Sequence, residues 1–401
     1  MALTKVDISL MDNVGTTANK LLAYDGSGNL PAVDSSLLTN VATGITESSS
    51  DPTISTNPSG GVGTEWHNTT SGEVYICTDA TAGANVWTNV GAGTGNVAPV
   101  TWYGVRGVIA GGYTPNFNTI DYITIATTGN ATDFGDMIVA KRTGTGCTNG
   151  NGGRGIFFGS TAGAAPEAIE YITFNTPGNA SDFGDYGDSY SFDSPGSGGN
   201  GIRGLLLGGA KLAGAGNYYN ETIQYVTIAT LGNGVDFGDM VNGAASARGA
   251  LDGTYCRYAG MHASPVPYTT NVIESLTVAT TGNAVDWADL TVARYFCSVV
   301  SSEAGRGVWA GGFSEPHSNI MDYITVATQA NAIDFGDLTI TCAGGGGMQN
   351  AARGCFAIGL TGPPQSLSNV IDYITIATTG NAVDFGDLTA ARGYHASASG
   401  D

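Results

Sequence analysis

Charge is scarce in this sequence, and most of it has one sign. Only 12% of the 401 residues are charged, with 14 Lys and Arg against 34 Asp and Glu, so the formal net charge is −20. Binding to nucleic acid or to an anionic membrane requires clustered Lys and Arg. We therefore expect neither as a partner, and we expect the acidic surface to favour solubility.

Long apolar runs are absent as well. No segment approaches the ~20 apolar residues that a membrane-spanning helix needs. Residues 1–7 (MALTKVD) also lack the apolar core and cleavage site of a secretory signal. The sequence therefore predicts synthesis and folding in a cytoplasm.

Residues that usually carry catalysis are few. The four histidines show no HExxH or similar ligand spacing, and no GxSxG nucleophile motif is present. The six cysteines have no CxxC spacing, which favours small buried thiols over disulfides or a zinc site. We expect no catalytic residue, no cofactor and no metal.

Glycine is abundant, with 62 residues, and its mixture with Thr, Asn and Ala suits short strands and tight turns. One sequence motif, written IDYITIATTGNATDFGD at residues 120–136, occurs in six similar copies, at residues 120–136, 169–185, 223–239, 273–289, 320–337 and 371–387. Repeats at a fixed period predict units that bury their apolar faces against one another. The same role in every unit also makes catalysis by the repeated residues improbable.

The period of the repeat indicates its architecture. The residues at the centre of each copy are Tyr122, Tyr171, Tyr225, Leu276, Tyr323 and Tyr373, at steps of 49, 54, 51, 47 and 50 residues. One period holds four strand-like pieces, which is the content of one propeller blade of ~50 residues.

These repeats resemble those of kelch-type propellers. Glycine pairs close the second strand at 111–112, 208–209 and 311–312, and an Arg follows the fourth strand, as in that family. The family's fourth-strand Trp survives only at Trp287 and is Phe elsewhere. The expected fold is all-β: a six-bladed kelch-like β-propeller over residues 99–401, with a small N-terminal β domain and an extended anchor.

Closure of this ring is a sharp expectation. The repeat zone opens with a second-type strand at Arg106 and ends with a lone first-type strand, residues 393–399. We expect the C-terminal strand to complete the blade begun by residues 105–139, which would leave no open edge.

Two sets of charged residues recur within the repeats. The arginines at the start of the second strand are Arg106, Arg154, Arg203, Arg257, Arg306 and Arg353. The aspartates of the fourth strand are Asp133, Asp182, Asp236, Asp286, Asp334 and Asp384. Buried charges need compensation, so we predict a structural ring of Arg–carboxylate contacts that tie the blades together. The alternative, a metal bound by Asp-Phe-Gly-Asp, lacks a dense acidic loop.

The N-terminal quarter has two parts. Residues 1–45 are polar with little pattern, and residues 46–98 contain three alternating segments that read as a small antiparallel meander. Residues 20–30 and 63–79 resemble segments of bacteriophage tail-fibre and appendage proteins, and the repeats are similar to ones in structural proteins of marine tailed phages. This resemblance implies a virion protein whose segment 1–45 attaches to other virion proteins, commonly as a homotrimer, with 46–98 as a spacer.

The connections between second and third strands differ in every copy, and such variable loops on a fixed frame usually carry recognition. Their candidate binding residues are Tyr113, Asn116, Phe117, Asn217, Tyr218, Tyr219, His262, Tyr268, Phe313, Glu315 and His317. Aromatic rings beside Asn and His suit sugars, so the predicted function is non-enzymatic binding of a host-surface polysaccharide. The loops could equally be ordinary solvated loops.

Two alternative functions stay open at this point. One is a head or neck decoration protein without a receptor. The other is a propeller glycan hydrolase or lyase, which would need a carboxylate pair drawn from Asp188, Asp193, Glu221, Glu303 and Glu315.

Overall fold

The computed structural model describes residues 45–90, 101–113, 115–160, 168–187, 192–211, 218–263, 269–362 and 364–401. The chain divides into two compact units, residues 1–99 and 100–401. The described residues are all-β, and no helix among them could cross a membrane. The predicted anchoring segment, residues 1–45, lies outside the described residues except for Ile45.

The first unit contains one small sheet, made of β1 (Thr46–Ser48), β2 (Glu65–Asn68), β3 (Val74–Asp79) and β4 (Val86–Asn89). Strands β2, β3 and β4 form the predicted antiparallel meander, and β1 adds to β2 in parallel. Its core is Tyr75, Cys77 and Trp87, all fully buried, with the Trp66 ring 5.9 Å from that of Trp87.

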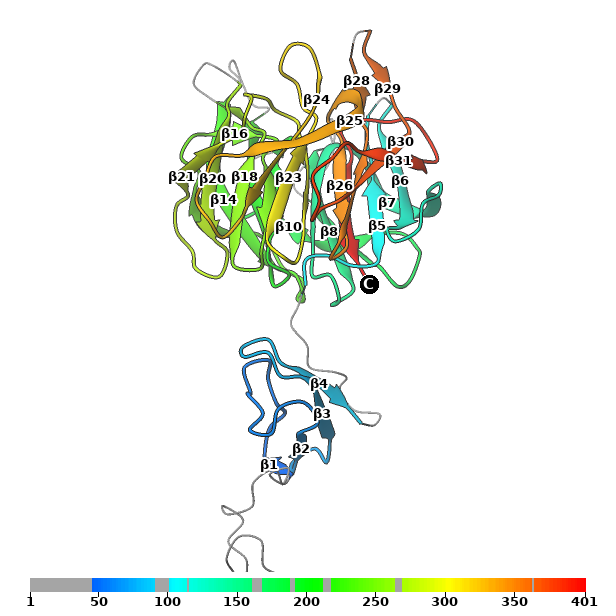
Figure 1. Cartoon of the computed structure of the whole chain (residues 1–401). Helices are drawn as coiled ribbons and strands as arrows, with labels where there is room; N and C mark the ends of the chain where they lie inside the picture. The colour runs from blue at the N-terminus through cyan, green and yellow to red at the C-terminus, as the bar shows by residue number, and fades with distance from the viewer. Residues whose placement is uncertain are drawn as a thin grey trace, which may run out of the picture. The chain divides into compact units, whose positions relative to one another are not determined.

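The second unit consists of six antiparallel repeats of four strands each (Figure 1). Repeat 1 is β32 (Ala396–Gly400), β5 (Arg106–Ala110), β6 (Phe117–Thr124) and the first part of β7 (Thr132–Thr148); repeat 2 is the last part of β7, β8 (Arg154–Ser160), β9 (Ala168–Thr173) and β10 (Ser181–Asp185). Repeat 3 is β12 (Gly196–Gly199), β13 (Arg203–Lys211), β14 (Tyr218–Thr227) and β15 (Val235–Asp239); repeat 4 is β17 (Arg248–Leu251), β18 (Tyr255–Ala259), β20 (Val272–Thr277) and β21 (Val285–Asp289). Repeat 5 is β22 (Ser298–Ser301), β23 (Arg306–Ala310), β24 (Ser318–Thr325) and β25 (Ile333–Ala343); repeat 6 is β26 (Gly346–Gln349), β27 (Arg353–Ala357), β30 (Val370–Thr375) and β31 (Val383–Asp387).

Short additional strands decorate these repeats. Strand β11 (Phe192–Asp193) pairs with β13, and β16 (Ala244–Ala245) pairs with β19 (His262–Ala263). A hairpin of β28 (Leu360–Thr361) and β29 (Ser366–Leu367) extends β25.

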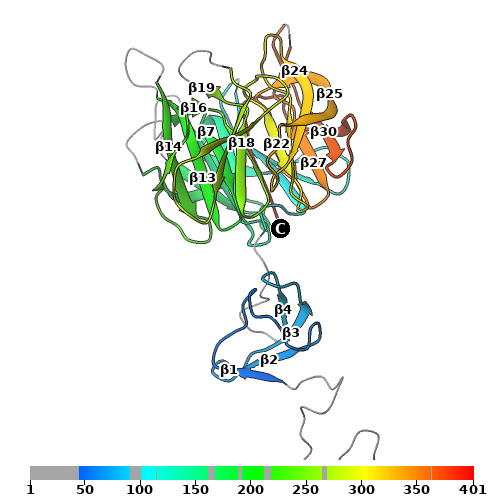
Figure 2. The same ribbon diagram turned by 60° about the vertical axis from the view of Figure 1, so that its left-hand side comes forward.

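The C-terminal strand completes the first repeat. Strand β32 pairs antiparallel with β5, with Ala396 opposite Ala110 and Gly400 opposite Arg106, so the predicted pairing of this strand is confirmed. The first strands of the repeats are neighbours in the order β32, β7, β12, β17, β22 and β26, and β26 again contacts β32. The repeats therefore follow one another around a common axis. Figure 2 shows strands of repeats 3 to 6 side by side, with β13, β18, β22 and β27 running in similar directions.

The apolar core lies between repeats. Six buried clusters each join two successive repeats. The cluster between repeats 6 and 1, for example, packs Ile109, Ile123 and Ile125 against Phe385 and Leu388. Each repeat thus needs both neighbours to bury its two faces, which explains why its third strand is apolar on both sides.

Hydrogen bonds between consecutive repeats explain why the sequence motif recurs. The Thr-Gly-Asn turn of one repeat bonds the Asp-Phe-Gly-Asp strand of the repeat before it: Gly129 N–H donates to the Phe385 carbonyl at 2.9 Å, and Asp387 N–H donates to Asn130 Oδ1 at 3.1 Å. The same amide-to-backbone bond recurs at Asn179, Asn233, Asn283, Asn331 and Asn381. The approach is close, since a Cβ added at Gly386 would lie 2.5 Å from the Gly129 carbonyl oxygen.

The predicted ring of Arg–carboxylate contacts is wrong, although the arginines do tie repeats together. Five of them donate Nη1–H to main-chain carbonyls of the next repeat: Arg106, Arg154, Arg203, Arg306 and Arg353. Each of these five also stacks on a tyrosine of its own repeat, with the arginine Cζ 4.4–4.7 Å from the ring centroid. The six fourth-strand aspartates (Asp133, Asp182, Asp236, Asp286, Asp334 and Asp384) are all exposed and form none of the ion pairs in the described residues. A carbonyl partner compensates a guanidinium without burying a second charge.

Arg257 lies two residues further along its strand than the other five arginines do along theirs. Tyr255 pairs with Thr277 as Arg306 pairs with Thr325, so Tyr255 occupies the position of the other arginines. Arg257 is buried and donates Nε–H to the Val326 carbonyl at 3.0 Å. It reaches the next repeat from a different register.

The ion pairs between repeats use other residues. The third strand carries a buried acid or amide in every repeat: Asp121, Glu170, Gln224, Glu274, Asp322 and Asp372. Three of them meet a buried cation of the preceding connection: Asp121–Arg392 at 3.0 Å, Glu170–Lys141 at 3.0 Å and Asp322–Arg294 at 2.9 Å. The corresponding cation position of repeat 5 is Cys342, so Asp372 has no cation there. It keeps the bonds from Thr339 N–H, at 2.9 Å, and from the Thr339 hydroxyl, as Asp121 does from Thr389.

Candidate functional site

The two ends of the 100–401 unit differ in construction. One end carries the C-terminus and the short turns between first and second strands and between third and fourth strands (Figure 1). The opposite end, called the loop end here, carries the β28–β29 hairpin, the connections between second and third strands, and the crossings to the next repeat. Those predicted binding residues that the structure describes lie in or beside the connections at the loop end.

An aromatic cluster at the loop end joins rings from repeats 3, 4 and 5 and from two of the crossings between repeats. The Tyr295 ring is its centre, with centroids 4.5 Å from His262, 5.2 Å from Phe313 and 5.1 Å from Phe296. Tyr219 extends it beyond His262 at 5.1 Å. His317 and Tyr394 extend it further, at 5.2 Å from Phe313 and 5.0 Å from Phe296 respectively. Six of these seven rings are partly exposed, and His317 is buried at 5%.

The cluster is uncharged near neutral pH. Burial lowers the pKa of His262 and of His317 below the ordinary 6.5, so both imidazoles are neutral at pH 7. Burial, with a smaller contribution from the charge of Glu315, raises the pKa of Tyr295, so its hydroxyl stays protonated. The exposed Glu315 places a negative charge near these neutral rings.

Unusual backbone holds two of these rings. Phe296 and Tyr394 have φ of 58° and 55°, and the corresponding Ser194, Ser246 and Gly344 also have positive φ. Main-chain bonds join three of these positions, with Tyr394 N–H donating to Gly344 O at 2.7 Å and Gly344 N–H donating to Phe296 O at 2.9 Å. A separate bond joins the other two, from Ser246 N–H to Ser194 O at 2.7 Å. A bulky residue in this region costs about 1–2 kcal/mol, and such strain concentrates at ligand sites. We call these five positions the collar.

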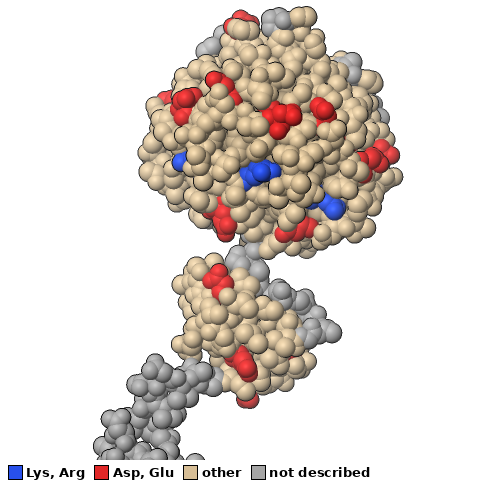
Figure 3. Space-filling model, turned by 45° about the vertical axis from the view of Figure 1, so that its right-hand side comes forward, with Lys and Arg blue, Asp and Glu red and all other residues tan. Residues whose placement is uncertain are grey.

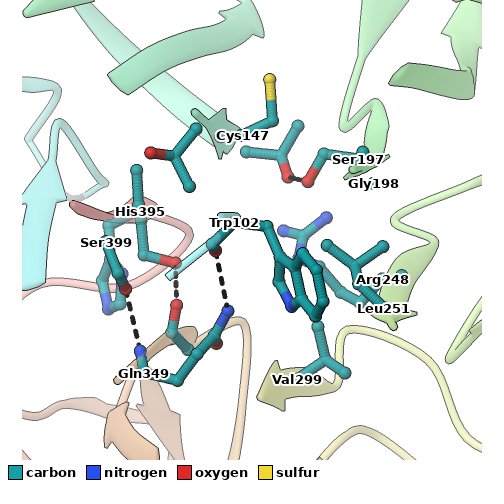
Figure 4. A pocket seen from close by; sticks show the side chains of 18 residues that line it. Trp102, Cys147, Ser197, Gly198, Arg248, Leu251, Val299, Gln349, His395 and Ser399 are labelled. Carbon is teal, nitrogen blue, oxygen red and sulfur yellow. Dashed lines mark hydrogen bonds between the residues drawn. The ribbon is translucent and has the colours of Figure 1, made fainter. Parts of the chain in front are cut away.

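Beneath the collar the first strands surround a cavity of about 60 Å³ (Figure 4). Its lining includes Trp102, Arg248, Gln349, His395 and Ser399. Burial lowers the pKa of His395 to about 3, and the charge of Arg392 acts in the same direction, so this imidazole is neutral. In the described residues, no group of three or more His, Cys, Asp or Glu side chains could hold a metal.

The structure gathers four predicted binding residues, Tyr219, His262, Phe313 and His317, into the aromatic cluster. Three others belong to repeat 1: Tyr113, whose ring faces the Arg142 guanidinium at 5.4 Å, Phe117, which faces Arg392 at 5.8 Å, and the exposed Asn116. Asn217, Tyr268 and the Tyr218 side chain lie outside the described residues.

Three ring residues were missed from the sequence: Tyr295, Phe296 and Tyr394. They belong to the crossings into the first strand, not to the variable loops. A signal was present, because each follows a buried Arg by one or two positions, at Arg294 or Arg392, in a stretch otherwise made of small residues.

The acids considered for glycan hydrolysis do not all share one end. Glu303 belongs to the turn before β23, and Glu315 to the connection after it. The five residues of β23 separate them by roughly 16 Å, whereas a catalytic pair needs about 5–9.5 Å. Glu221 is exposed, and the side chains of Asp188 and Asp193 lie outside the described residues.

No protein-family model and no curated protein matches this chain. A solved structure titled "Structure of YjhT" is similar to it, with a TM-score of 0.53 and 12% sequence identity over 65% of this chain and 88% of that one. In all, 523 solved chains match. The likeness is one of fold. At this identity it carries no information on ligand or activity, because one fold hosts many functions.

Proposed function

We propose that this chain is a non-enzymatic bacteriophage appendage protein, whose residues 100–401 form a closed, six-bladed, kelch-like propeller that binds a host-surface glycan at the loop end. The single observation that carries the binding proposal is the aromatic cluster around Tyr295, in which rings from repeats 3, 4 and 5 approach to 4.5–5.2 Å and remain partly exposed.

The propeller proposal is supported by the strand order. Six four-stranded repeats, six clusters between neighbours and the pairing of β32 with β5 are what a closed ring of blades requires. The assignment to a virion is supported by the sequence resemblance of residues 20–30, 63–79 and the repeats to phage appendage proteins. The same resemblance supports attachment through residues 1–45 and a trimer.

The cluster suits an uncharged sugar. Sugar rings present apolar faces that stack on aromatic side chains, and neutral imidazole and phenol groups can orient their hydroxyls. A strongly anionic polysaccharide fits less well, because the protein carries a net charge of −20. On the face shown in Figure 3, acidic side chains are scattered over this unit and basic ones are few.

A glycan array of host-surface polysaccharides, probed with the full chain, tests the proposal. We expect binding to neutral glycans that Tyr295→Ala weakens about 10-fold or more, which corresponds to ~1.4 kcal/mol. Tyr103→Ala is the matched control, since it removes a tyrosine next to the start of β5, at the opposite end, and it should leave binding unchanged.

Three results would count against this function. Absence of binding to any host polysaccharide would favour a decoration protein. Equal loss in Tyr103→Ala and Tyr295→Ala would show that the loop end is not the site. Shortening of the polysaccharide during incubation, abolished by Glu315→Gln, would establish an enzyme instead.

A further inference from the structure

One arginine inside the ring of first strands has no carboxylate partner. Arg248 begins β17 and lines the central cavity (Figure 4). Its Nη1–H groups reach the carbonyls of Pro195 and Ala247, and Nη2–H reaches that of Gly144, all at 3.3 Å. These are long bonds beside the usual 2.9–3.0 Å, and none of the ion pairs in the described residues includes Arg248.

The charge of Arg248 persists in this setting. Burial lowers its pKa to about 10, which still leaves the guanidinium protonated at pH 7. The neighbouring cations do not share a counter-charge with it, because Arg294 is paired with Asp322 and Arg392 with Asp121. Arg248 is half-buried, and its three long carbonyl bonds bring no negative charge, so an anion in the adjoining cavity would add the missing counter-charge.

The cavity beside Arg248 has the size and lining for such an anion. Its volume is about 60 Å³, whereas one water needs roughly 10–15 Å³. Hydroxyls of Thr145, Ser197, Ser397 and Ser399 line it, and the Trp102 indole and Gln349 add N–H donors. Trp102 Nε1 is buried without a hydrogen-bond partner among the described residues.

We propose that the cavity under the collar binds a small monovalent inorganic anion of chloride or bromide size, held by the Arg248 guanidinium. None of the seven rings of the aromatic cluster lines this cavity, so the proposal does not depend on glycan binding. A free halide is favoured over the acid group of a larger ligand, because the cavity admits only an ion with one or a few waters.

Crystals of the wild-type full chain grown in sodium bromide give the direct test. We expect an anomalous peak within about 3.5 Å of the Arg248 guanidinium nitrogens. In solution, replacing sodium gluconate by sodium chloride at constant ionic strength should raise Tm by roughly 5 °C once chloride is 100-fold above its Kd. Gluconate is too large for the cavity and serves as the reference anion.

Variants decide whether Arg248 is the cause. Arg248→Gln should abolish the chloride-dependent rise, and Arg142→Gln, which removes an arginine that does not line the cavity, should retain it. Ordered water alone at Arg248 in bromide crystals, or an equal chloride effect in Arg248→Gln, would overturn the proposal. If Arg248→Gln does not fold, Arg248→Lys and the wild-type bromide crystals decide, since the lysine should keep the peak.

Discussion

The ion pair at the closing junction offers a demanding test of how the ring is held. Asp121 of repeat 1 and Arg392 of repeat 6 are both fully buried, with Oδ2 and Nη2 3.0 Å apart. In Asp121→Asn the amide can still accept from Thr389 N–H, which donates to Asp121 at 3.0 Å. The Arg392 charge, however, would lose its only carboxylate, and Nε and Nη1 already have no hydrogen-bond partner among the described residues.

Removing one member of a buried ion pair costs about 3–5 kcal/mol. For a unit of this size, at the low end of the usual sensitivity of ~2 °C per kcal/mol, Tm should fall by about 6–10 °C. The matched control is Asp372→Asn, which occupies the same position in repeat 6 but has no cation partner. We expect Asp372→Asn to change the free energy of unfolding by less than ~1 kcal/mol.

Urea unfolding monitored by fluorescence, together with calorimetry, measures both variants. The double variant Asp121→Asn with Arg392→Met should recover much of the stability, because no buried charge is left unpaired. Equal destabilisation by Asp121→Asn and Asp372→Asn would refute the reasoning, since both acids would then act only as hydrogen-bond acceptors for the preceding connection.

Three further predictions concern single features of the fold. Burial raises the pKa of Asp372 above its ordinary 3.8, so the folded state binds this proton more tightly than the unfolded state does. The free energy of unfolding of the wild type, relative to Asp372→Asn, should therefore fall as the pH rises from 3.8 through the raised pKa. Urea titrations at several pH values measure this difference. Gly135→Ala should cost about 1–3 kcal/mol, because the new Cβ would lie 2.4 Å from the Gly178 carbonyl carbon, whereas Ala288→Gly at the same position of repeat 4 should cost less than that. Burial raises the pKa of all six free thiols, so a thiol reagent at pH 8 should label none in the folded protein and six after unfolding; labelling of the native state would contradict the buried placement.

Local chemistry alone accounts for much of the architecture. Strand and turn residues at a steady period predicted the all-β fold, the four strands of each repeat and the pairing of the C-terminal strand with the segment after Arg106, because alternation and turn residues are local properties. The variable loops also supplied four members of the aromatic cluster, including His262 and Phe313.

Only the tertiary structure decided which groups meet across repeats. The arginines donate to main-chain carbonyls and not to the exposed aspartates. The third-strand acids pair with Lys141, Arg294 and Arg392. Both sets of partners lie in neighbouring repeats, where strand twist and register, and not spacing along one segment, decide which side chains meet. Tyr295 became the centre of a cluster through crossings that bring three repeats together. Sequence periodicity fixes which residues are equivalent, while contacts at a distance depend on how equivalent surfaces pack.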